Sequence, residues 1–129
     1  MATYLEIAEN EYKFLIETLE IGDYANVAYK SQQASEKYLK HLVEIKGEPS
    51  KDVRELLHTH SLQSLYRYLK NTLDIEIELD ISELSLLTSL YYDVRYPNIN
   101  YFIPDKREAM LYIEITKEIR RKVLDIIEE

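Results

Sequence analysis

Turn-forming residues are scarce along this chain, which has only two glycines and three prolines in 129 residues. That is about a third of the usual share. Folds made of many short strands need a tight turn between successive strands, and glycine and proline supply most of those turns. The scarcity therefore argues against such folds and favours a few long helices. The apolar fraction of 46% indicates a folded chain, and the length predicts one domain, residues 1–129.

Apolar residues recur at steps of three and four along most of the chain, which is the spacing of helices that bury one face. We predict five helices with short turns at 50–57, and the helices cover residues 3–20, 23–46, 61–71, 80–95 and 104–127. Gly22 ends the first helix, and Asp23 caps the second by accepting a hydrogen bond from a free backbone N–H. The sequence thus predicts an all-α fold, an antiparallel up-and-down bundle of about five helices.

Residues 74–81 depart from the helical pattern because acidic and apolar residues alternate strictly. Period two is typical of a strand. A lone strand has no partner in a helical chain, so we predict an extended segment that crosses the bundle with its acidic side chains in water. Asp80 or Ser82 then caps the fourth helix.

Several classes of site are excluded by composition. The chain has no cysteine, so it has no disulfide and no thiolate nucleophile. Its two glycines lie too far apart for a phosphate-binding glycine-rich loop. There is no apolar run long enough to cross a bilayer and no apolar leader. We therefore predict a cytoplasmic protein without a cofactor and without membrane contact.

The net charge of −8 argues against non-specific nucleic-acid binding, which depends on neutralising phosphates. Positive charge is concentrated in residues 27–72 and around Arg95, however, so a local anion site remains compatible with the sequence. Of the three histidines, His41 lies mid-helix, and His58 and His60 lie two apart on an irregular segment. No third ligand lies nearby, so we predict no metal site, and we expect His60 to make a structural hydrogen bond at the start of the third helix.

Residues 90–102 carry the most distinctive chemistry, because one arginine lies among tyrosines where the fourth helix ends. Arginine binds phosphate oxygens through two N–H groups, and tyrosine rings stack on exposed bases. We predict a nucleotide or RNA site here, and its candidate residues are Arg95, Tyr92, Tyr96 and Tyr101. In the alternative interpretation, the tyrosines fill the end of the bundle or a dimer seam, and Arg95 pairs with an acidic side chain.

Three stretches together resemble the HEPN family, small helical-bundle proteins of bacteria and archaea. Residues 28–40 resemble its second-helix pattern Q-x-A-x-E-K-x-L-K, and residues 60–62 (His-Ser-Leu) resemble the start of its third helix. Residues 91–97 resemble the end of its fourth helix. The order of the three stretches and the chain length also agree, so the resemblance covers nearly the whole chain.

The resemblance implies a homodimer, often encoded beside a small nucleotidyltransferase in a toxin–antitoxin pair. Many members of the family are metal-independent ribonucleases with an R-x(4–6)-H motif, in which the arginine stabilises phosphate and the histidine transfers protons. Arg95 matches the arginine, but the positions open to the histidine hold Asn100, Tyr101 and Phe102. Asparagine cannot transfer a proton, and tyrosine, with an ordinary pKa of about 10, is a poor base at neutral pH.

We therefore expect a HEPN-like dimeric module that partners a nucleotidyltransferase and contacts RNA or nucleotide near Arg95, without ribonuclease activity. Arg95 is the one candidate catalytic residue. Two alternatives stay open: a metal-independent ribonuclease in which His58 or His60 replaces the missing histidine, and a purely structural dimer. Modification of Tyr101 by an adenylylating partner is a further alternative.

Overall fold

The structure is a computed structural model that describes residues 1–93 and 103–128. Within these ranges it contains helices and no strand, so the predicted all-α fold is confirmed. The elements are α1 (Tyr4–Lys13), α2 (Leu15–Glu20), α3 (Tyr24–Lys46), α4 (Lys51–Leu56), α5 (Leu62–Arg67), the π-helical turn η1 (Tyr68–Thr72), α6 (Ile81–Asp93) and α7 (Lys106–Ile127).

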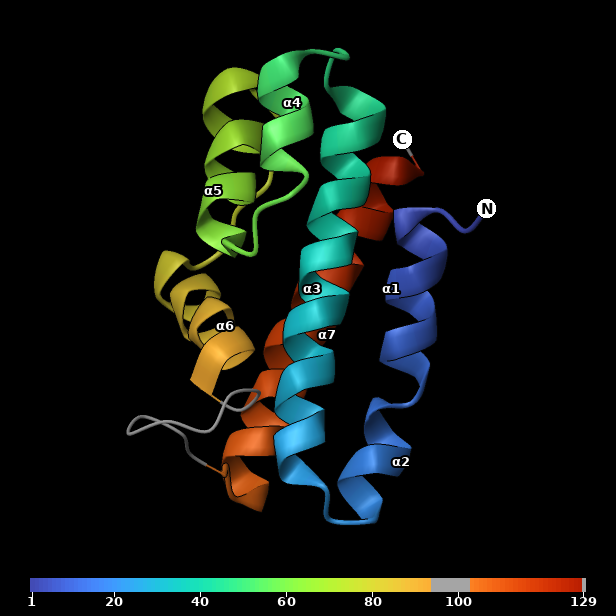
Figure 1. The fold of residues 1–129 in the computed structure, drawn as a ribbon, viewed down its shortest axis with the longest axis vertical. Helices are drawn as coiled ribbons and strands as arrows, with labels where there is room; N and C mark the ends of the chain where they lie inside the picture. The colour runs from blue at the N-terminus through green and yellow to red at the C-terminus, as the bar shows by residue number, and fades with distance from the viewer. Residues whose placement is uncertain (94–102, 129) are drawn as a thin grey trace.

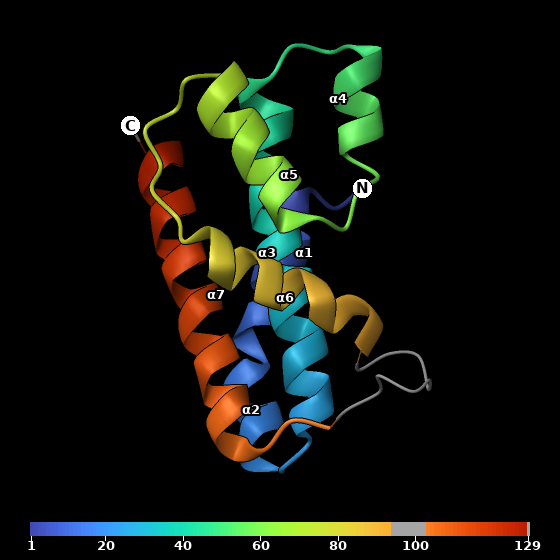
Figure 2. The same ribbon diagram turned by 90° about the vertical axis from the view of Figure 1, so that its left-hand side faces the viewer.

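Helix α3 is the central element of the bundle. It runs along the length of the molecule, with α1 and α2 on one side, α7 behind it, and α4, α5 and α6 on the other side (Figure 1). Helix α6 crosses α3 obliquely, and no described element lies over its outward side (Figure 2). The main core cluster includes residues of α1, α3, α5, α6 and α7. None of the described helices has the length and apolar character needed to cross a bilayer.

The helix predicted over residues 3–20 is divided into α1 and α2 at Phe14. The hydroxyl of Thr18 donates to the backbone oxygen of Phe14 at 2.8 Å. Such a bond from a threonine to the preceding turn bends helices. Leu15 then packs with Val27 of α3 and Ile113 of α7 in a second, smaller core cluster. The bend at Phe14 therefore turns α2 towards α7.

Capping side chains set most helix boundaries where the sequence predicts them. Asp23 accepts from the N–H of Asn26 at the start of α3, as predicted. Asp105 and Glu108 form a capping box at the start of α7, where each side chain accepts from the other residue's backbone N–H. At α6 the choice between two predicted caps is settled, because Asp80 accepts from the N–H of Glu83 at 3.2 Å.

The predicted crossing segment joins η1 to α6 without regular secondary structure, but it is not extended throughout, because Asp74 has a left-handed φ of 53° and the N–H of Ile77 donates to the carbonyl of Ile75. Ile77 is buried in the core, and the N–H of Leu79 donates to the hydroxyl of Tyr66 at 3.2 Å. The acidic side chains that alternate with the apolar ones are exposed, and they are Asp74, Glu76, Glu78 and Asp80. Up to Asp80 the apolar side chains thus face the core and the acidic ones face water, as the sequence predicts, whereas Ile81, the last residue of the alternation, begins α6 and is 39% exposed.

Candidate functional site

The C-terminal end of α6 carries the one predicted site residue that the structure describes. Tyr92 lies there with 52% of its surface exposed. The other three candidates, Arg95, Tyr96 and Tyr101, lie outside the described residues. The structure therefore shows the element that leads into the predicted site and the side chains that surround the end of that element.

Four rings from three segments meet at this end of α6, and we call Tyr29, His60, Tyr91 and Tyr92 the aromatic cluster. The rings of His60 and Tyr91 are stacked, with their centroids 3.9 Å apart and their planes 16° apart. Tyr92 meets Tyr91 edge-on at 4.9 Å, and Tyr29 of α3 lies 6.5 Å from Tyr91. Because Tyr91 contacts the other three rings, it ties the end of α6 to α3 and to the residue that precedes the start of α5.

His60 is oriented by a buried carboxylate of α3. Its Nδ1 lies 2.9 Å from Oε1 of Glu36, whose side chain is fully buried. An ionised carboxylate can only accept, so the Nδ1 of His60 must be the donor. The neutral imidazole then has its free lone pair on Nε2. The structural hydrogen bond predicted for His60 is confirmed.

Glu36 receives hydrogen bonds on both of its oxygens. The Nε2 of Gln32 donates to Oε1 at 3.2 Å, in addition to His60. The ammonium groups of Lys37 and Lys40 donate to Oε2 at 2.7 and 3.0 Å. This donor set explains how a glutamate is accommodated in the core, because a buried charge is tolerated only when it is paired and hydrogen-bonded.

The two charged partners respond differently to burial. Burial alone would raise the pKa of Glu36, but the hydrogen bond from Lys37, the charges of Lys37 and Lys40 and the bond to His60 together hold this pKa below its usual value. Burial lowers the pKa of Lys40, and the charge and hydrogen bond of Glu36 offset only part of that effect. With one carboxylate facing two ammonium groups, the network carries net positive charge beside His60 in an otherwise acidic protein.

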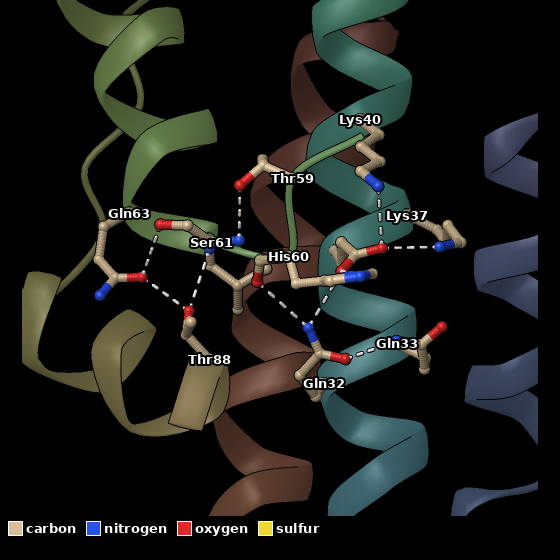
Figure 3. A network of polar contacts seen from close by, with 11 residues as sticks. Gln32, Gln33, Lys37, Lys40, Thr59, His60, Ser61, Gln63 and Thr88 are labelled. Atoms are coloured by element: carbon tan, nitrogen blue, oxygen red, sulfur yellow. Dashed lines mark hydrogen bonds and ion pairs between the residues drawn. The ribbon is translucent and has the colours of Figure 1, made fainter. Parts of the chain in front are cut away.

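Further hydrogen bonds fix the start of α5 between α3 and α6 (Figure 3). The Nε2 of Gln32 also donates to the backbone oxygen of His60 at 3.4 Å. On the other side, the N–H of Leu62 donates to the hydroxyl of Thr88, which donates to Oε1 of Gln63 at 2.6 Å. These contacts hold the backbone at His60 and directly after it, and thereby help to keep its ring against Tyr91.

Reasoning from the sequence alone did not find this network. The sequence does carry one signal of this network. Gln32, Glu36 and Lys40 follow one another at steps of four, on the same helical face as the core residues Ala28 and Leu39. Charged residues on a stripe of core residues indicate a buried, paired network. The other two histidines lie outside it, since His58 is exposed and the Nδ1 of His41 is buried without a hydrogen-bond partner among the described side chains.

The arrangement offers three chemical functions at one place. Nε2 of His60 can accept or donate a proton, the exposed ring of Tyr92 can stack on a base, and the lysines beside Glu36 supply positive charge. Among the described residues, no three acidic or histidine side chains gather closely enough to hold a metal ion.

Comparisons with known proteins agree with this architecture. The family model of the HEPN domain matches residues 1–127. The crystal structure of TT1696 from Thermus thermophilus is similar, with a TM-score of 0.78 and 25% sequence identity over 95% of this chain and 94% of that one. No curated protein sequence matches the chain.

Proposed function

Because the chain belongs to the HEPN domain family, we propose that it is a dimeric module that contacts RNA or a nucleotide at the end of α6. The aromatic cluster carries this proposal. It holds the half-exposed ring of Tyr92 three residues before Arg95 along the chain. A tyrosine ring can stack on an unpaired base while a nearby guanidinium binds the adjacent phosphate.

The proposed partner protein is a small nucleotidyltransferase, in a toxin–antitoxin-type pair. Family membership supports this part of the proposal, together with the homodimer, because the resemblance in the sequence implies both. The missing histidine after Arg95 supports a binding role over RNA cleavage, since the positions that would hold it carry Asn100, Tyr101 and Phe102.

The direct test is the fluorescence anisotropy of a labelled single-stranded RNA titrated with the full chain. We expect Arg95→Ala to weaken binding at least tenfold. Tyr92→Ala should weaken it by a similar factor, because base stacking on an aromatic ring contributes about 1–3 kcal/mol. Arg54→Ala is the matched control, since it removes the same charge from an exposed position on α4. If Arg95→Ala and Arg54→Ala weaken binding equally, or if the wild type does not bind, the proposal is wrong.

A second candidate function is a metal-independent ribonuclease, and the geometry of His60 favours it specifically. Glu36 fixes Nδ1 of His60 as the donor and leaves Nε2 free to take the proton of a ribose 2′-hydroxyl. The ring also lies against Tyr91, four residues before Arg95. His60 is thus the stronger of the two histidines that the sequence leaves open for this role.

RNA cleavage in the presence of a metal chelator separates the two functions. A binding module gives no cleavage above background in the wild type. A ribonuclease cleaves, and both Arg95→Ala and His60→Ala then abolish its activity. His58→Ala is the control, because His58 is also a histidine but is exposed.

A further inference from the structure

The ring of His60 has one nitrogen that the protein uses and one that it does not. Nδ1 donates to Glu36, whereas Nε2 makes no hydrogen bond with any residue that the structure describes. The side chain is 35% exposed, so protons from water can reach the ring. Histidine is also the side chain that most readily changes charge between about pH 5 and 8. His60 therefore offers a group of variable charge within the aromatic cluster.

The surroundings of His60 let its charge change without a change of hydrogen bonding at Nδ1. Among the described residues, the charged and titratable side chains that face the ring or its partner carboxylate are Glu36, Lys37, Lys40 and Tyr29 of α3 and Tyr91 and Tyr92 of α6. Burial alone would raise the pKa of Glu36, but its hydrogen bonds and the two lysine charges hold this pKa below its usual value, so the carboxylate is ionised near neutral pH. Nδ1 therefore donates to Glu36 whether or not Nε2 carries a proton.

A proton on Nε2 changes what the aromatic cluster can bind. It turns this nitrogen from an acceptor into a donor and gives the ring a positive charge. A hydrogen bond from a charged donor to a phosphate oxygen is stronger than one from a neutral donor. In a chain with net charge −8, the added charge also reduces the repulsion of RNA phosphates. The protonated state of His60 thus favours an anionic ligand beside the exposed ring of Tyr92.

We propose that His60 makes RNA binding at the aromatic cluster depend on pH, with the protonated ring donating from Nε2 to a phosphate oxygen, so that affinity rises as the pH falls. This inference rests on the proposed function and adds the regulation of its site. It also separates binding from cleavage, because a histidine that takes the proton of a ribose 2′-hydroxyl must start neutral.

The fluorescence anisotropy of a labelled single-stranded RNA, titrated with the full chain between about pH 5.5 and 8, tests the inference. We expect the dissociation constant of the wild type to fall about tenfold towards the acid end, and the slope of log Kd against log salt to steepen by about one, because one more phosphate is neutralised. His60→Gln keeps a donor for Glu36 but takes up no proton in this range, so both changes should disappear. His58→Gln is the matched control at an exposed position and should keep both. Asp93→Asn, beside Tyr92 in the sequence, should also keep them, since carboxyl groups ordinarily titrate at lower pH.

An NMR titration of the His60 ring in the wild type makes the test independent of how well the variants fold. The pH at which the ring gains its proton should coincide with the pH at which RNA affinity changes. If the wild type binds RNA equally across the range, or if His58→Gln or Asp93→Asn removes the pH dependence as fully as His60→Gln does, the proposed function stands and the inference is wrong. If the wild type binds no RNA at any pH, the proposed function is wrong and the inference falls with it.

Discussion

At the scale of single residues, Glu36 has the largest effect on the site. It is fully buried, and its two oxygens accept hydrogen bonds from His60 and from three side chains of its own helix, Gln32, Lys37 and Lys40. Exposed ion pairs in this protein, such as Lys51 with Glu55, contribute less to stability, because water screens them and holding two long side chains in one geometry costs entropy. The orientation of His60, and hence of the ring stack, depends on one carboxylate.

We expect Glu36→Gln to lower the free energy of unfolding by about 3 kcal/mol at neutral pH, because it leaves the buried charge of Lys40 without its counter-ion. Adding Lys40→Met to this variant should recover part of the loss, since the uncompensated charge is then removed. Urea unfolding of the wild type, the two single variants and the double variant measures both effects. Additive losses in the double variant would contradict this explanation.

The pH dependence of the same variant has a definite sign. The pKa of Glu36 is depressed below its ordinary value of 4.5, so its ionised form stabilises the fold above that pH. This contribution is lost as the pH falls through the lower, folded-state pKa. The difference in stability between the wild type and Glu36→Gln should therefore be constant near neutral pH and shrink below pH 4.5. A difference that stays constant into the acid range would show that the carboxylate charge is not the cause.

At the scale of elements, the helix boundaries that are set by capping side chains could be predicted from the sequence. The helix boundary that is set by tertiary contacts could not. Asp23 and Asp105 cap their own helices through bonds to N–H groups three residues ahead, and the sequence shows such caps directly. The break at Phe14 has no glycine or proline to mark it. It accompanies the bond from Thr18 and the packing of Leu15 against α3 and α7, and residues 3–20 alone do not show that packing.

Gly22 connects α2 to α3 through a left-handed turn, with φ of 81°. The N–H of Gly22 donates to the carbonyl of Leu19, and that of Asp23 donates to the carbonyl of Thr18, which is a Schellman motif. No atom lies within 4 Å of an added Cβ, so the cost of a substitution comes from the backbone conformation. We expect Gly22→Ala to lower stability by about 1–2 kcal/mol and Gly22→Asn by less, because asparagine tolerates this conformation better. Equal losses in urea unfolding would contradict this.

At the scale of the whole molecule, the sequence predicted the fold class and the exposure of the acidic side chains in residues 74–80, but not the arrangement of side chains around the end of α6. The hydrogen bond of His60 was predicted and is confirmed, and the binding role of Tyr92 stays a prediction. The stack of His60 on Tyr91 was not, because it brings together the residue before α5 and the end of α6. The pairing of His60 with Glu36 spans 24 residues. Such contacts depend on how the helices pack, which local patterns do not encode.

The central claim is that RNA binds at the end of α6, and an NMR titration tests it most directly. A short single-stranded RNA is added to the isotope-labelled chain, and the backbone and ring signals are followed. We predict shifts at Tyr91 and Tyr92 and in the ring of His60, while signals of α4, which lies beside α5 at the upper end of the molecule in Figure 1, stay unchanged. Shifts concentrated on α4 or α2, with the end of α6 unaffected, would contradict the claim.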